Sequence, residues 1–331
     1  MHGLGIDIVP LPFYSEDAYA RLADAGAAEK ALRVLHGILK RVEQCNELRR
    51  ADIVWIHRFA APIGTGLVAS CIKALKRPLI YSYDDAVYIK RGKPNRFRDW
   101  FGSWRDIDGA VAKSDAVLAW NRELQAHALH REKEVCLLPA AVDTARYAEI
   151  RQSIIASHDD LTFRLGWIGT PATARYLDLV HSVLSTLARE GPVEIRLIGG
   201  DMAEVPGATV RRIRWQQETE VQELCEVDVG IAPLPDDPWT RGKSGLKVVQ
   251  YMGCGLPVVA SAVGAHLDLI QDGVQGFLVD SQEEWLDALR TLRDNRLLRS
   301  RMGVSGFETA QTKHDFSVVA RAVADVCKQV G

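Results

Sequence analysis

The sequence has few cysteines and no long apolar run, and each absence excludes a class of protein. Its six cysteines are scattered, with no CxxC pair and no clustered histidines, so neither a disulfide framework nor a zinc site is indicated. No apolar stretch approaches the roughly 20 residues of a membrane span. The first residues also lack the basic and apolar regions of a signal peptide. These features predict a cytoplasmic protein with free thiols and no bound metal.

The chain also lacks an excess of charge of either sign. Its 41 Lys and Arg residues nearly balance 43 Asp and Glu residues, which argues against a dedicated nucleic-acid binder. Low-complexity tracts and solenoid repeats are missing as well. What remains is an ordinary globular composition, and a length of 331 residues predicts two domains.

Short apolar runs alternate with segments of helical periodicity. This alternation predicts parallel, doubly wound α/β sheets. Residues 140–160 lack strong periodicity and are interpreted as a linker. We expect strands over residues 5–9, 53–56, 79–83, 116–119, 134–138, 163–168, 193–198, 209–213, 228–232, 256–260 and 276–279. We expect helices over residues 18–50 (with Leu32, Leu35, Ile38, Leu39 and Val42 in phase), 64–75, 110–113, 122–129, 171–189, 218–226, 246–252, 283–292 and 305–330.

One stretch, residues 228–264, combines a strand, a proline-rich loop, a helix and a second strand. The loop ends in Lys243, Ser244 and Gly245, directly before the helix. Free N–H groups, the positive end of the helix dipole and a lysine together favour an anion. A glycine-rich loop without ligand is the alternative. A P-loop is not indicated, because Asp237 occupies the position of its first glycine.

A second turn points to the same kind of ligand. Gly169 and Thr170 follow a predicted strand, Thr170 is a good helix N-cap, and Thr173 lies in the first turn. Alone this is an ordinary strand-to-helix turn. Together with residues 242–245 it predicts a phosphate-bearing ligand at the carboxyl edge of a parallel sheet, with Trp215 at the end of another strand.

Polar side chains also follow two strands of the N-terminal half. His57 and Arg58 end one strand, and Asp84 and Asp85 end the next. Because the carboxyl ends of parallel strands share one edge, these residues form a candidate site. The alternative is structural, with His57 and Arg58 pairing with a carboxylate and the aspartates capping a turn.

The segment between Lys90 and Arg105 interleaves basic and aromatic residues. It holds six Lys and Arg residues (90, 91, 93, 96, 98 and 105) around Trp100, Phe101 and Trp104. Such a segment can lie on the anionic inner membrane. A solvated basic loop with its aromatic residues in the core is the alternative.

Several segments resemble the retaining glycosyltransferases of family 4, which have the GT-B fold. They are PLIYSYDDAVY, LLPAAVDTARY, GWIGTPAT, GLKVVQYMGCG and GLPVVASAVGAHLDLIQDGVQGFLVD. The resemblance covers most of the chain and is strongest over residues 164–280. It implies two Rossmann-like domains facing a central cleft: an acceptor-side domain over residues 1–145, which lacks the family's usual first strand, and a donor domain over residues 160–310. The last helix, residues 315–330, is expected to pack back on the first domain.

The resemblance also implies a function. It implies transfer of a sugar, with retention and without cofactor or metal, from a nucleotide sugar to a saccharide, glycan or lipid-linked acceptor in envelope or exopolysaccharide synthesis. The implied donor-binding residues are Gly169, Thr170, Thr173, Trp215, Lys243, Ser244, Gly245, Leu246 and Gln250, with Arg241 or Arg175 as an added charge. Asp84, Asp85 and His57 are the implied catalytic residues, and Arg58 lies on the acceptor side.

The chain departs from the family pattern at the donor loop. The family often carries two glutamates there, and Gly242 and Gln250 stand in their places. Asp84 or Asp85 stands where a histidine often ends a strand. Two alternatives therefore stay open. One is a relative without catalysis that binds nucleotide sugars or serves as a scaffold, and the other is an epimerase of the same architecture.

Overall fold

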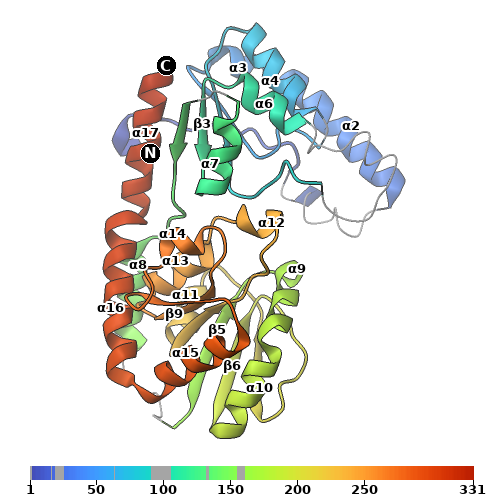
Figure 1. Cartoon of the computed structure of the whole chain (residues 1–331). Helices are drawn as coiled ribbons and strands as arrows, with labels where there is room; N and C mark the ends of the chain where they lie inside the picture. Colours follow the sequence, from blue (N-terminus) through green and yellow to red (C-terminus); the bar gives the residue numbers. More distant parts are fainter. Residues whose placement is uncertain are drawn as a thin grey trace. The chain divides into compact units, whose positions relative to one another are not determined.

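The computed structural model describes residues 2–15, 17–18, 26–62, 64–90, 106–131, 134–154 and 161–331. The chain forms two compact units (Figure 1). The N-terminal unit comprises Met1–Leu138 and Ala320–Gly331, and the C-terminal unit comprises Pro139–Val319.

The described part of the N-terminal unit is built on a four-stranded parallel sheet in the order β1-β2-β3-β4. The two central strands, β2 and β3, are buried along their whole length, as expected for strands covered on both faces. Its elements are η1 (His2–Leu4), α2 (Ala27–Glu43), α3 (Cys45–Arg50), β1 (Val54–His57), α4 (Thr65–Ala74), β2 (Leu79–Tyr83), α6 (Ile107–Lys113), β3 (Ala116–Ala119), α7 (Arg122–Leu129), β4 (Glu134–Leu137) and the end of α17 (Phe316–Val330).

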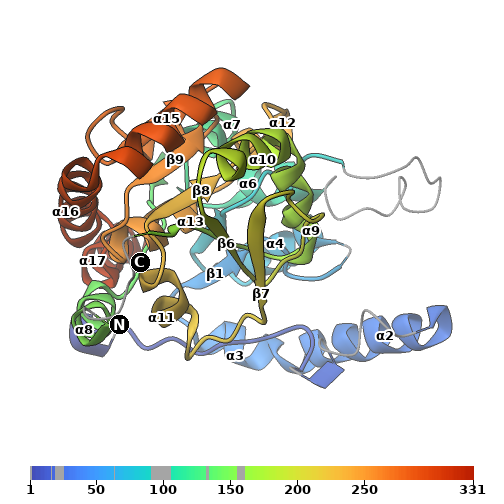
Figure 2. The same ribbon diagram turned by 90° about the horizontal axis from the view of Figure 1, so that it is seen from below.

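The C-terminal unit has a six-stranded parallel sheet in the order β10-β9-β8-β5-β6-β7. Helices cover both faces, with α10 and α15 on one and α11 and α13 on the other (Figures 1 and 2). Its elements are α8 (Thr144–Ile154), β5 (Phe163–Ile168), α9 (Pro171–Ala174), η3 (Arg175–Val180), α10 (His181–Glu190), β6 (Val193–Ile198), β7 (Ala208–Ile213), α11 (Glu220–Cys225), β8 (Val229–Ala232), α12 (Pro238–Arg241), α13 (Leu246–Gly253), β9 (Val258–Ser261), α14 (His266–Leu269), β10 (Gly276–Val279), α15 (Gln282–Asp294) and α16 (Arg296–Lys313).

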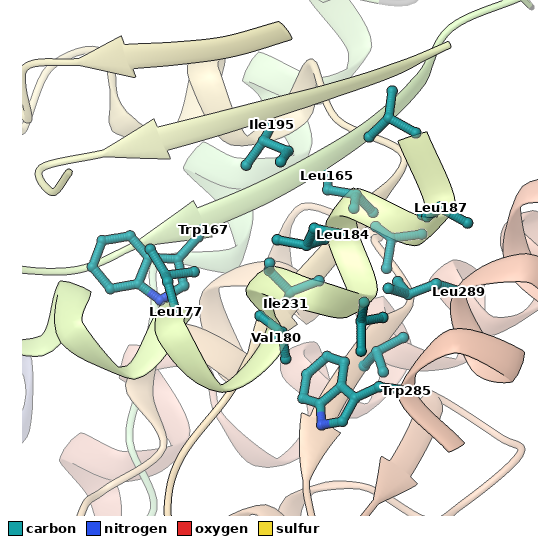
Figure 3. Packing of buried hydrophobic residues seen from close by; sticks show 14 of the residues in the cluster. Leu165, Trp167, Leu177, Val180, Leu184, Leu187, Ile195, Ile231, Trp285 and Leu289 are labelled. Carbon is teal, nitrogen blue, oxygen red and sulfur yellow. The ribbon is translucent and has the colours of Figure 1, made fainter. Parts of the chain in front are cut away.

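The core of the C-terminal unit lies between this sheet and the pair α10 and α15. Leu165 of β5, Leu184 of α10 and Leu289 of α15 are fully buried in one cluster (Figure 3). Trp167, near the end of β5, is also fully buried and carries this cluster to the carboxyl edge of the sheet. The packed core therefore fixes the loops that leave that edge.

The strand predicted over residues 5–9 is wrong. These residues form no strand, and Ile8 and Val9 expose 55% and 68% of their surface. A strand needs a hydrogen-bonding neighbour, and the prolines at positions 10 and 12 remove two backbone donors from the following segment.

Other element boundaries differ from the predicted ones. Residues 144–154 form α8 of the C-terminal unit, so the predicted linker contains a helix. The predicted helix over residues 18–50 is α2 and α3, and residues 19–25 lie outside the described part. The predicted helix over residues 305–330 is divided between α16 and α17, because the Asp315 carboxylate accepts bonds from the Thr144 hydroxyl at 2.6 Å and the Ser317 N–H at 2.8 Å.

Candidate functional site

The order of strands in the C-terminal sheet marks one point on its carboxyl edge. β5 pairs with β6 on one side and with β8 on the other. The sheet extends from β6 to β7 in one direction and from β8 through β9 to β10 in the other, so the strand order reverses between β5 and β8. In open parallel sheets, ligands bind outside the carboxyl ends of the strands at such a point. The loops that leave β5 and β8 are the two turns for which the sequence predicts a phosphate-bearing ligand.

The loop after β8 contains a short helix, α12, that the sequence did not predict. The Asp237 carboxylate accepts a hydrogen bond from the Thr240 N–H at 2.8 Å and so caps α12, with Pro238 at its first position. Gly245 ends the loop with φ 72°, and a Cβ there would lie 2.4 Å from the Leu269 side chain. The positive φ and this close contact favour glycine at the residue before α13.

The first turn of α13, at the end of this loop, presents two amides that make no hydrogen bond to the described residues. The N–H of Val248 is the first to bond within the helix, to the carbonyl of Gly245 at 2.9 Å. The N–H groups of Leu246 and Lys247 precede this ladder, and they lie at the positive end of the helix dipole. This is the arrangement that binds phosphate at helix N-termini.

Two lysines lie at this turn. The Nζ atom of Lys243 lies 5.8 Å from the centre of the Trp239 ring, and that of Lys247 lies 4.4 Å from the centre of the Trp167 ring. Burial, helped by the charge of Lys243, lowers the pKa of Lys247 to about 7. A bound anion would offset both causes, because it supplies the opposite charge.

Lys247 is a candidate binding residue that the sequence analysis missed. Its signal was present, because it is the only cation in the segment LKVVQYMG, which forms α13. A lysine in the first turn of a helix lies where helix dipoles favour anions rather than cations. Such a misplaced charge points to a ligand that compensates it.

The turn after β5 is built as predicted, but two of its amides are bonded within the protein. Thr170 is the N-cap of α9, with Pro171 at the first helical position. The N–H of Gly169 donates to the Ile198 carbonyl at 3.0 Å, and the N–H of Thr170 donates to the Thr173 hydroxyl at 3.1 Å. The contact of Gly169, Thr170 and Thr173 with a phosphate therefore stays a prediction, and the amides of Gly169 and Thr170 would have to exchange their present bonds to make it.

The remaining predicted donor residues lie near this edge and differ in exposure and in hydrogen bonding. Trp215 exposes 49% of its surface and lies beside Gly199, which packs against the carbonyl of Gly169. The side chain of Gln250 is hydrogen-bonded to Tyr147 of α8. Ser244 and Leu246 flank Gly245, and Leu246 exposes 42% of its surface.

The two arginines considered as added charges are both engaged. Arg241 forms an ion pair with Asp236, and its Nη2 donates to that carboxylate at 2.8 Å. Arg175 donates to the Tyr176 hydroxyl at 3.3 Å and lies over the Tyr176 ring.

The four polar residues predicted in the N-terminal half form one cluster at the carboxyl edge of their own sheet. The guanidinium of Arg58 donates to the Asp84 carboxylate at 2.6 Å and pairs with Asp85 at 2.9 Å. The Nε2 atom of His57 lies 3.6 Å from Asp84. The pairing expected of a structural role is thus present.

The environment of His57 favours the neutral form of its ring. Burial lowers its pKa, against the attraction of Asp84. Its Nδ1 atom lies 2.9 Å from the Ser82 hydroxyl, and the Trp55 indole N–H donates to that hydroxyl at 2.7 Å. The Trp120 ring, just after β3, is 6.4 Å from that of His57, and its buried Nε1 has no hydrogen-bond partner among the described residues. The cluster therefore offers a neutral imidazole and an unused donor.

The basic-aromatic segment is described only at Lys90, because residues 91–105 lie outside the described part of the chain. Its membrane contact stays a prediction. Across the ranges that the structure describes, no helix is both long and apolar enough to cross a membrane. Within the same ranges, no three His, Cys, Asp or Glu side chains gather as metal ligands.

Solved structures define the class of fold. Sucrose-phosphate synthase from Thermosynechococcus elongatus aligns over 89% of this chain and 78% of its own, with a TM-score of 0.68 and 14% identity. The Anabaena protein HepE, solved in complex with UDP-glucose, aligns over 92% of this chain and 90% of its own, with a TM-score of 0.63 and 16% identity. The chain has the GT-B fold, as predicted.

The sequence comparisons identify the domain that carries the first candidate site. Residues 162–295 match the family model for Glycosyl transferases group 1. The chain is 31% identical over 134 residues to a D-inositol 3-phosphate glycosyltransferase of Nocardioides sp., spanning 40% of this chain and 28% of that relative. It is 25% identical over 296 residues to the phosphatidyl-myo-inositol mannosyltransferase of Mycobacterium leprae, spanning 84% of this chain and 74% of that relative. These matches support a glycosyltransferase.

Proposed function

We propose that this protein transfers a sugar, with retention, from a nucleotide sugar to a saccharide or lipid-linked acceptor in envelope or exopolysaccharide synthesis. The observation that carries the proposal is the first turn of α13. There, these two amides and two lysines meet at the topological switch point of a GT-B donor domain. HepE, which has been solved in complex with UDP-glucose and with UDP, supports a nucleotide-sugar donor.

The chemistry follows from the charge that develops on the leaving group. As the bond between the sugar and the diphosphate breaks, negative charge grows on the departing oxygen. Fixed N–H donors and lysine charges that are already in position stabilise it without reorganising. Lys243 and Lys247 supply the charge and the first amides of α13 supply the donors. We infer that Trp215, an exposed ring beside the turn after β5, contacts the nucleotide.

The N-terminal cluster is the proposed acceptor side. His57, kept neutral by burial, is suited to accept a proton from an acceptor hydroxyl or to hydrogen-bond the sugar. Arg58 neutralises the acidic pair and holds it in one geometry. We propose that Asp84 and Asp85 orient His57 and contact hydroxyl groups. An acceptor rich in hydroxyls, such as a saccharide or a polyol headgroup, fits this set of donors and acceptors.

A two-stage experiment tests the function. A panel of UDP-, GDP- and ADP-sugars is first screened for protection of the full-length protein against thermal unfolding. The nucleotide sugar that protects best is then incubated with saccharide and lipid-linked acceptors, and glycosylated product is measured by mass spectrometry. We expect protection by at least one donor and product with at least one acceptor. Protection by none of the panel contradicts the proposal, whereas protection without product with any acceptor supports the scaffold alternative.

A further inference from the structure

Two of the six cysteines come together at the edge of the C-terminal sheet opposite the proposed donor turn. Cys225 is the last residue of α11, and Cys254 directly follows α13. α11 leads into β8 and α13 leads into β9, and these neighbouring strands are paired from Gly230 and Val258 onward. Both helices lie on the same face of the sheet (Figures 1 and 2). The topology therefore brings both cysteines to the amino edge of the sheet.

The two thiols are in hydrogen-bond contact, and neither cysteine forms a disulfide. This contact, together with the charge of Arg151 in α8, lowers the pKa of the Cys225 thiol. Burial has the opposite effect on Cys254 and raises the pKa of its thiol. The Cys254 S–H is thus the donor, and Cys225 is the cysteine that becomes a thiolate more readily.

Close packing against α8 confines Cys254. Its neighbours on both sides are glycines, and a Cβ at Gly253 would lie 2.7 Å from the Tyr147 ring. A Cβ at Gly255 would lie 2.5 Å from the Arg151 guanidinium. Both of these side chains belong to α8, which packs against α11 as well as against α13. The same helix therefore confines Cys254 and supplies the positive charge beside the thiols.

Cys225 differs from Cys254 in access. Its side chain is partly exposed, whereas Cys254 is only 2% exposed, so a small oxidant reaches Cys225 first. Cys225 also ends a helix of six residues, where few backbone bonds hold it. It can therefore move the short way that an S–S bond of about 2 Å requires. Thiols that only fill space in a core need neither a cation beside them nor access to solvent.

We propose that Cys225 and Cys254 are a redox-active pair that hydrogen peroxide converts into an intramolecular disulfide, with Cys225 as the attacking thiol and Cys254 as the resolving one. This pair does not depend on the proposed transferase activity. Because exchange with a free thiol such as dithiothreitol breaks the disulfide again, the modification is reversible.

The reaction balances with peroxide as the oxidant. The Cys225 thiolate attacks one peroxide oxygen, the O–O bond breaks, and the departing hydroxide takes up the proton that Cys225 released. Cys225 is then a sulfenic acid. The Cys254 sulfur attacks the Cys225 sulfur, the S–O bond breaks, and the hydroxide leaves with the Cys254 proton as water. Two thiols are oxidised to one disulfide, and one peroxide is reduced to two waters.

Peptide mapping of the full-length protein tests the proposal. The reduced protein is treated with an equimolar amount of hydrogen peroxide, its remaining thiols are alkylated, and the tryptic digest is analysed by mass spectrometry without reduction. Trypsin cleaves between the two cysteines, at Lys243 and Lys247, so the disulfide joins two separate peptides. We expect the linked peptides of Cys225 and Cys254, and we expect the link to disappear with dithiothreitol. If the folded wild type gives no such link, the proposal is overturned.

Single substitutions assign the two roles. In Cys254→Ser, Cys225 should accumulate as a sulfenic acid that dimedone labels, whereas Cys225→Ser should show neither a link nor a label at Cys254. The control Cys71→Ser removes an exposed cysteine of α4 and should form the link like the wild type. The wild-type result stands by itself if a serine variant fails to fold. Links from Cys225 to Cys71 as frequent as those to Cys254 in the folded wild type would contradict a pair selected by the fold.

Discussion

The pKa of Lys247 predicts that nucleotide-sugar binding weakens as pH rises. In the free protein this pKa is about 7 because of burial and the charge of Lys243. A bound diphosphate favours the charged lysine, so the ligand binds the protonated protein preferentially. With a pKa of 7, about nine-tenths of the free protein is protonated at pH 6 and about one-hundredth at pH 9. If binding requires the proton, Kd rises about tenfold per pH unit above 7.

Isothermal titration with a nucleotide sugar measures this directly. A nucleotide sugar is the right ligand because its diphosphate is a diester whose charge does not change over this range. Proton uptake on binding, obtained by repeating the titration in buffers of different ionisation enthalpy, should approach one proton between pH 8 and 9. In Lys247→Met the pH dependence should disappear. A flat profile in the wild type, or the same slope in Lys247→Met, would refute the reasoning.

The same residue makes a prediction about stability with a definite sign. The folded-state pKa of Lys247 lies below its unfolded value, so the unfolded chain binds more protons between about pH 7 and pH 10.5. The free energy of unfolding is therefore lowered by the full cost of burying the charge below pH 7, and this cost disappears as pH rises towards 10.5. At pH 7, Lys247→Met should be more stable than the wild type by about 1–3 kcal/mol in free energy of unfolding, and it should melt at a higher temperature. It should nevertheless bind the donor more weakly.

Three further predictions concern the two candidate sites. Lys243→Ala should weaken donor binding by about 1–3 kcal/mol, the contribution of a charge-assisted hydrogen bond, and an unchanged Kd would exclude contact with the phosphates. Asp84→Asn and Asp85→Asn should lower kcat by about 10- to 100-fold with little change in donor Kd. If neither changes kcat, the pair is structural. Gly245→Ala should destabilise by about 2–4 kcal/mol, because it adds a clash to positive φ, whereas the control Gly273→Ala has positive φ without a neighbour within 4 Å and should cost about 1 kcal/mol.

The parts of the fold that are encoded locally could be predicted from the sequence. The buried strands of both sheets are short apolar runs. The dipeptide Thr170-Pro171 marks the N-cap and first residue of α9. The loop before α13 could be recognised because its glycines and Lys243 are adjacent in the chain. The false strand over residues 5–9 had the same apolar pattern but no partner strand, and a partner cannot be read from a local pattern.

The parts that depend on distant residues could not be predicted. Lys247 gains its low pKa partly because the fold buries it, with its Nζ atom over Trp167, 80 positions earlier in the chain. The amide of Gly169 is unavailable because a neighbouring strand supplies the carbonyl of Ile198. The spacing of apolar residues predicted the helix α2. Its orientation depends on the packing of Phe13 on Gly37 and on the bond from Arg41 to Ala60, and these contacts join residues far apart in the sequence.

The central claim is that the first turn of α13 binds the diphosphate of the sugar donor. The most direct test compares donor binding by the wild type and by Lys243→Ala/Lys247→Met, using isothermal titration at pH 6.5–7 with the nucleotide sugar that best protects the wild type. The variant should be folded and should lose about 2–4 kcal/mol of binding free energy. A folded variant that binds the donor with the wild-type Kd would contradict the claim.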